Sequence, residues 1–267
     1  MNIKTLIKCL SLQIDPKKYE LFVKNLDYKK LLEEEPVEIR DKCYLDNGDL
    51  VETDLEHTCE YFEFHRNLNE KYKLSEITTA DTDFKKAVQI LNWFTENTFY
   101  NGAMLRYITD NTIEILNYAF GKTFKNAINC RLKAIAFADC LVAVGIKAYP
   151  LCMQSTEFKN CHFTCRAYIS ELDKWCVFDP SFGCWFADKS GKPIDIFEMR
   201  EMFLQGVEPT INGYNFNGTT ECLNEYMSGF LKLCISNLST WSDNSMDRRN
   251  TKKLPEKKKF NAKLPNS

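Results

Sequence analysis

One cysteine in this sequence lies where a nucleophile could form. Cys130 follows Asn129, a residue type that often caps helices, and it precedes a long apolar run, so we expect it at a helix N-terminus. The free N–H groups and the dipole at that end favour a thiolate, which is the nucleophilic form of cysteine. Cys130 is therefore either a small apolar residue of a core helix or a catalytic nucleophile, and its partners decide between the two.

A nucleophilic thiol needs a base, because a free thiol ionises only with a pKa of about 8.5. The sequence has three histidines. His162 opens an expected strand, whereas His57 and His65 lie in a charged region and are expected at the surface. Asp179 ends the next expected strand, where an unpaired carboxylate would be costly and where it could orient the histidine ring. The order Cys130, His162, Asp179 makes these three residues the candidate catalytic group.

These side chains have to be positioned by a helix and two neighbouring strands. Apolar residues at helical spacing predict helices beginning near Thr82, over 112–120 and over 129–144, and the last is apolar on nearly every face, as expected of a buried central helix. Aromatic and β-branched residues predict strands over 146–153, 162–169 and 174–179. A helix over 195–204 and another from Glu221 to about Leu238 follow. Helices followed by an antiparallel sheet predict an α+β fold.

The turn between the last two strands raises a problem of register. A tight turn over 171–174 would pair Asp179 with about Arg166, several positions from His162. On that register a bulge or a strong twist would have to bring Asp179 and His162 together.

The chain is expected to divide into three parts. Residues 1–80 form a mostly helical N-terminal extension, with a helix over 19–32 and a hairpin over 43–51 around Asn47-Gly48. Residues 81–241 form the catalytic domain. Residues 242–267 carry eight Lys and Arg against three Asp and Glu, and few of them are apolar, so we expect a disordered basic tail.

With these residues in place, the sequence resembles the transglutaminase-like superfamily over roughly residues 80–205, including bacterial members. The resemblance rests on Cys130, Gly145-Ile-Lys-Ala148, His162-Phe163, Trp175-Cys-Val-Phe-Asp179-Pro180, Thr82-Asp-Phe84, Ile90-Leu-Asn-Trp93 and Ile194-Asp-Ile-Phe-Glu-Met-Arg200. The Trp175–Pro180 segment is its most specific part.

The resemblance implies a papain-like core in which Cys130, His162 and Asp179 carry out thiol-dependent acyl transfer on a peptide or protein substrate. The acceptor is water in a protease or deamidase and an amine in a transglutaminase. The Cys130 backbone N–H could stabilise the oxyanion, and Tyr100 and Asn101 are candidates for the second donor. Three residues depart from the family pattern in ways that bear on the substrate: Asn129, Tyr149 and Arg166.

Other functions receive less support from the sequence. A net charge of −2 gives no reason to expect nucleic acid or a membrane surface as partner, and without an export signal or spanning segment we expect a cytoplasmic protein with no cofactor. A zinc site would need ligands among Cys161, Cys165, Cys176 and Cys184, but these lack the short C-x-x-C spacing. A non-catalytic interaction domain on the same fold is the main alternative, and papain-like peptidases and arylamine N-acetyltransferases share the chemistry. Nothing in the sequence indicates an oligomeric state.

Overall fold

A computed structural model describes residues 55–102, 104, 108, 111–121, 124–154, 161–218, 220, 237–241 and 257–260. Its helices are α4 (Leu55–Tyr72), α5 (Leu74–Ile77), α6 (Asp83–Asn97), α7 (Thr112–Ala119), α8 (Cys130–Ala143) and α9 (Ile196–Leu204), with short 3-10 turns η2 (Phe124–Asn126) and η3 (Ser170–Leu172). Its strands are β1 (Ala148–Gln154), β2 (Cys161–Ile169), β3 (Lys174–Asp179), β4 (Cys184–Ala187), β5 (Thr210–Asn212), β6 (Asn237–Trp241) and β7 (Lys257–Phe260).

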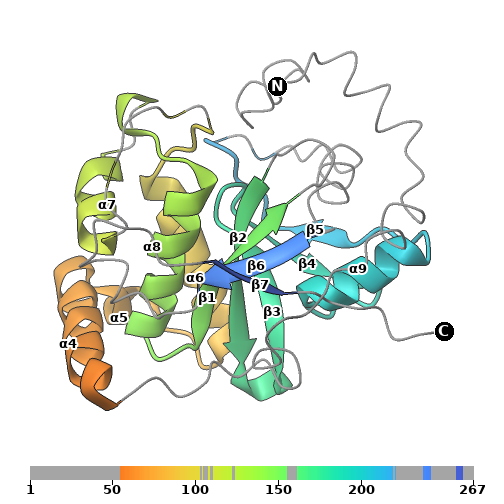
Figure 1. The fold of residues 1–267 in the computed structure, drawn as a ribbon, viewed down its shortest axis with the longest axis horizontal. Coiled ribbons are helices and arrows are strands. Elements are labelled where there is room, and N and C mark those ends of the chain that lie inside the picture. The colour runs from red at the N-terminus through yellow and green to blue at the C-terminus, as the bar shows by residue number, and fades with distance from the viewer. Residues whose placement is uncertain are drawn as a thin grey trace.

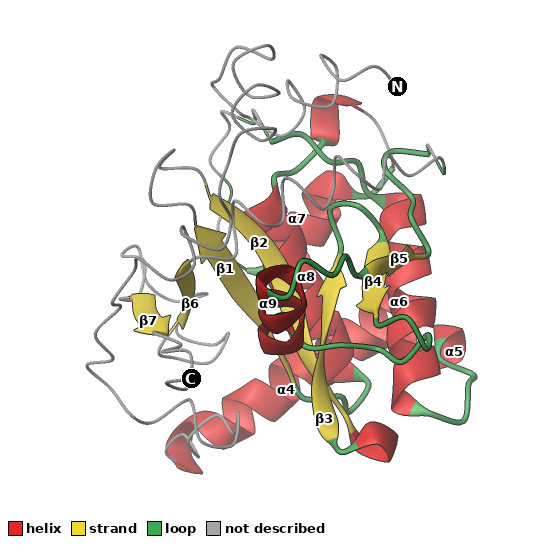
Figure 2. Cartoon of the chain, turned by 90° about the vertical axis from the view of Figure 1, so that its right-hand side faces the viewer, coloured by secondary structure: helices red, strands yellow, loops and turns green. Residues whose placement is uncertain are grey.

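The described strands form one sheet in the order β5-β4-β3-β2-β1-β6-β7, and every neighbouring pair is antiparallel. Figure 1 shows α4, α6, α7 and α8 gathered beside the sheet, and Figure 2 shows α9 in front of the sheet with those helices behind it. The prediction of helices combined with an antiparallel sheet is confirmed.

Side-chain caps start the helices close to the predicted residues. Thr82 caps α6, and the Asn129 side chain accepts the Leu132 N–H at the start of α8. Gly145 follows the end of α8 with a φ of +89°, a conformation that glycine adopts without a steric penalty. Local sequence therefore fixes Cys130 as the first residue of α8.

Helix α8 is the main apolar support of the sheet. It is buried from Leu132 to Leu141 and packs against β1 and β2 as well as α4, α6 and α7. Phe163, Cys165 and Ala167 on alternate positions of β2 join the same core. A helix buried on all sides cannot shift without disrupting several neighbours, so its N-terminus is a rigid place for a reactive group.

The register between β2 and β3 corrects the sequence prediction. Val177, not Asp179, lies opposite Arg166, and Ile169 pairs with Lys174. Residues 170–173 form a four-residue loop in which η3 is followed by Asp173 with a φ of 49°, so the strands are offset by two positions from a tight turn over 171–174. Continuing this register places Asp179 opposite Thr164, which shares a strand face with His162. No bulge is needed.

The C-terminal prediction is partly wrong. A helix was expected from Glu221 to about Leu238, and residues 221–236 of it lie outside the described part of the chain. Its expected end is not helical, because residues 237–241 form β6 beside β1. Within the predicted basic tail, residues 257–260 form β7 next to β6, and the remaining tail residues lie outside the described part.

The predicted N-terminal extension is described only from Leu55 onward. The helix expected over 19–32 and the hairpin expected over 43–51 fall outside the described residues. Leu68 of α4 and Leu74 of α5 are fully buried in the same core as α8, so the predicted boundary at residue 80 does not separate two cores, and the domain division stays a prediction. None of the helices in the described ranges has the length and apolar character needed to cross a membrane.

Candidate active site

Cys130 combines a helix N-terminus with access to solvent. Six cysteines have described side chains, of which Cys130 is partly exposed and the other five are buried: Cys140, Cys152, Cys165, Cys176 and Cys184. Within the described part of the chain the Cys130 backbone N–H has no protein acceptor. The thiol and an N–H donor are thus available at the same helix end, as attack on a carbonyl group requires.

His162 bridges the other two candidate residues. Its Nε2 lies 2.7 Å from Oδ2 of Asp179, and its ring also makes a hydrogen bond with the Cys130 side chain. Since Nε2 is engaged by the carboxylate, Nδ1 is the nitrogen left for the thiol. The structure therefore brings together all three residues that the sequence indicated.

The protonation of His162 follows from its surroundings. The ring is buried, with 1% of its surface exposed, and burial by itself lowers the pKa of a histidine. The charge and the hydrogen bond of Asp179, with a smaller contribution from Cys130, outweigh burial and raise the pKa of His162 to about 10. A histidine held as imidazolium beside a thiol favours a thiolate–imidazolium pair.

Asp179 is fixed through both carboxylate oxygens. Oδ2 faces His162, while Oδ1 accepts the backbone N–H groups of Ser181 at 2.8 Å and Phe182 at 3.3 Å. Asp179 has no exposed surface, and the Phe182 ring lies 5.5 Å from the His162 ring. The turn after β3 thus determines which oxygen the histidine meets.

Three of the five buried thiols are held in their protonated form by burial. Burial raises the pKa of Cys140 and of Cys165 well above the ordinary value, and it raises the pKa of Cys176 to about 12. A thiol that stays protonated at neutral pH is a weak nucleophile. Among the described residues no cluster of three or more histidine, cysteine or acidic side chains could hold a metal ion.

The two candidates for a second oxyanion donor have engaged backbone amides. The N–H of Asn101 donates to Ile128 O, and the N–H of Tyr100 donates to Oδ1 of Asn217 at 2.7 Å. Nδ2 of Asn217 donates back to Tyr100 O at 3.0 Å, so one side chain holds both main-chain groups of Tyr100. These two hydrogen bonds form a clamp that holds Tyr100 in place. Tyr100 pairs with Ile128, and Ile128 lies two residues before Cys130.

We expect Asn217→Ala to lower the free energy of unfolding by about 2 kcal/mol, because it removes the two hydrogen bonds that Asn217 makes to the main chain of Tyr100. Asn217 also has a φ of 52°, which alanine tolerates less well than asparagine. Urea denaturation measures the loss, and Asn217→Gly is the matched control because glycine accepts the φ but cannot form the clamp. A glycine variant as stable as the wild type would show that the clamp contributes nothing.

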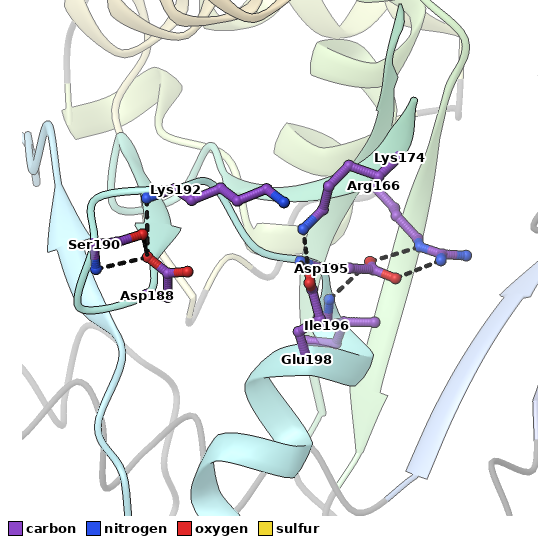
Figure 3. A network of polar contacts seen from close by, with 8 residues as sticks. All are labelled: Arg166, Lys174, Asp188, Ser190, Lys192, Asp195, Ile196 and Glu198. Carbon is purple, nitrogen blue, oxygen red and sulfur yellow. Dashed lines mark hydrogen bonds and ion pairs between the residues drawn. The ribbon is translucent and has the colours of Figure 1, made fainter. Parts of the chain in front are cut away.

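Tyr149 of β1 and Arg166 of β2 contact each other. Arg166 donates from Nε to Asp195 at 2.7 Å and from Nη1 to the Tyr149 hydroxyl at 2.7 Å. Asp195 also caps α9, and Figure 3 shows its carboxylate between the Arg166 guanidinium and the first turn of that helix. Burial raises the pKa of Tyr149 to about 12, with Arg166 opposing the shift. Arg166 and Tyr149 thus attach α9 to the sheet.

Two buried polar groups were not anticipated from the sequence. His65, expected at the surface, is 4% exposed, and its Nε2 lies 3.4 Å from Oδ1 of Asp139 in α8. Lys133 of α8 is 1% exposed. The signal for both lay in α8, where Lys133 and Asp139 are charged residues within a mostly apolar run. Charges are rarely buried without a partner, so each indicated a polar contact inside the core.

No family model matches this sequence, and no curated protein matches it. Three solved structures resemble the fold at low similarity. A proposed cysteine protease from Cytophaga hutchinsonii is 18% identical with a TM-score of 0.34, over 58% of this chain and 47% of the other. A proposed protease from Parabacteroides distasonis is 16% identical with a TM-score of 0.32, over 51% and 27%. A structure described as a TGase is 18% identical with a TM-score of 0.28, over 49% and 34%. The chain spans less than half the length of each of these structures.

Proposed function

We propose that this chain catalyses thiol-dependent acyl transfer through Cys130, His162 and Asp179. One observation carries the proposal: the His162 ring is hydrogen-bonded to Asp179 on one side and to the Cys130 side chain on the other. A nucleophile, a base and a group that orients the base are the parts that such a reaction needs.

In the first step the Cys130 sulfur attacks the carbonyl carbon of an amide or ester. The carbonyl oxygen becomes an oxyanion, for which the Cys130 backbone N–H is one donor. When the tetrahedral intermediate collapses, the bond to the leaving group breaks, and the His162 imidazolium gives that group its proton. The product of this step is a thioester on Cys130, with His162 neutral.

In the second step an acceptor attacks the thioester carbonyl and passes a proton to neutral His162. Sulfur then leaves as the thiolate, which restores the starting ion pair. Water as acceptor gives hydrolysis or deamidation, and an amine gives transfer. We propose a peptide or protein as the acyl donor, in line with the resemblance of the sequence.

The test is a panel of acyl donors comprising glutamine-containing peptides, other peptide amides and aryl esters, each with and without hydroxylamine. We expect aryl esters to react fastest, because their leaving group needs little protonation, and we expect mass spectrometry to locate the acyl group on Cys130. Cys130→Ser serves as the control. If no donor acylates Cys130 and this thiol reacts with iodoacetamide no faster than a free thiol, the proposal is wrong and a non-catalytic interaction domain takes its place.

A further inference from the structure

Lys133 is a charged side chain in the first turn of the apolar helix α8. It is 1% exposed, and its neighbours along the helix, from Leu132 to Leu141, are buried as well. Lysine is rarely buried to this extent, because its ammonium group loses its hydration and must find other partners. The partners of Lys133 therefore indicate what the buried charge does.

The ammonium group joins two main-chain segments at the candidate site. Nζ of Lys133 donates to Pro180 O at 3.1 Å and to Thr98 O at 3.4 Å, and it lies 5.3 Å from the centre of the Phe94 ring. Pro180 directly follows Asp179, the carboxylate that faces His162. Thr98 is the C-cap residue of α6, and it precedes Tyr100, which pairs with Ile128 just before Cys130.

The other end of Lys133 lies on the helix that carries the thiol. Lys133 is one turn beyond Cys130, and its backbone N–H donates to Asn129 O at 3.0 Å. The turn that begins at Asp179 is itself held together, since Oδ1 of Asp179 accepts the N–H groups of Ser181 and Phe182. A displacement of Pro180 would therefore move Asp179 and, through it, His162.

We propose that Lys133 is a positioning residue for acyl transfer, which holds the turn after Asp179 at a fixed place relative to the N-terminus of α8. The inference rests on the proposed function. Lys133 is too deeply buried to touch a substrate, so it acts through Pro180 and Asp179 on the geometry of the thiol and the imidazole. Small displacements of a reacting group are costly, and a shift of about 1 Å lowers a rate by about 100-fold.

The test compares Lys133→Met with Ile135→Val in the full chain. Methionine matches the length of lysine but has neither its charge nor its donors. Ile135 is a fully buried residue of the same helix with an apolar side chain, so its variant reports on destabilisation alone. For Lys133→Met we expect kcat on an aryl ester to fall by about 10- to 100-fold with KM little changed. We also expect iodoacetamide to label Cys130 more slowly at pH 6. Ile135→Val should change neither quantity.

The outcomes separate this inference from the proposed function. A wild-type Cys130 that neither labels preferentially nor turns over a donor would overturn both. If the wild type is active and folded Lys133→Met matches it in kcat and in labelling at pH 6, only the role of Lys133 is rejected. Lys133→Gln, which keeps an amide donor without the charge, replaces the methionine variant if that variant does not fold, and the same comparison then applies.

Discussion

Replacing His162 with alanine is expected to reduce aryl-ester turnover by at least about 1,000-fold. Replacing Cys130 with alanine should reduce it by the same factor. Without the ring, Cys130 has no imidazolium to favour its thiolate, and the leaving group has no proton donor. The double variant should be no slower than either single variant, because the parts of one catalytic unit fail together rather than additively. Initial rates with the same ester, measured for all three variants, check this expectation.

His65→Ala provides the matched control for that experiment. His65 is also buried and also contacts an aspartate, but its partner is Asp139, in the body of α8. We expect this variant to lose stability and to keep its turnover at temperatures where it is folded. If His65→Ala and His162→Ala reduce turnover equally, the loss results from disrupted core packing, and His162 has no catalytic role.

Asn in place of Asp179 is expected to lower turnover by about 100-fold or more in a folded protein. The backbone N–H groups of Ser181 and Phe182 need an acceptor at the Oδ1 position, so the asparagine oxygen should stay there and its amide group should face His162. Nε2 of His162 must then accept, which places the ring proton on Nδ1, the nitrogen that has to accept a proton from Cys130. Ester kinetics measure the loss. If Asp179→Asn turns over the ester at the wild-type rate, Asp179 does not belong to the catalytic group.

The same variant has a pH signature with a definite sign. In the wild type the pKa of His162 is raised from 6.5 to about 10, so the stability that this shift contributes is complete below pH 6.5 and is lost as the pH rises through 10. Without the charge of Asp179, burial remains and the pKa of His162 should fall well below 10. The difference in free energy of unfolding between wild type and Asp179→Asn should therefore be largest near pH 6 and shrink toward pH 10. Urea denaturation at pH 6, 8 and 10 tests this trend.

Much of the site could be predicted because it depends on local signals. Asn129 is a capping residue in front of an apolar run, so Cys130 could be placed at a helix end from sequence alone. The position of His162 at the start of a strand followed from its aromatic and β-branched neighbours in the same way. These features are set by a few adjacent residues, and they hold in the structure.

The parts that could not be predicted depend on contacts between distant residues. The register of β2 and β3 is set by the conformation of the loop at residues 170–173, which composition alone does not reveal. His65 was expected at the surface because its neighbours in sequence are charged, but Asp139 from α8 offers it a buried partner. Strand β6 replaced the end of an expected helix because pairing with the edge of β1 outweighs local propensity.

The loop at residues 170–173 has a consequence for how this protein can change over evolution. Alternation along a strand has a period of two, so gaining or losing one loop residue would turn Asp179 to the opposite face from His162. Gaining or losing two would keep the face but move the carboxylate along the strand by about 6 to 7 Å. Point substitutions at most loop positions do neither. Selection at this hairpin should therefore act on the number of residues more strongly than on their identity, with two exceptions. Asp173 has a positive φ that favours aspartate, asparagine or glycine, and the Glu171 carboxylate accepts the backbone N–H groups of Asp83 and Phe84.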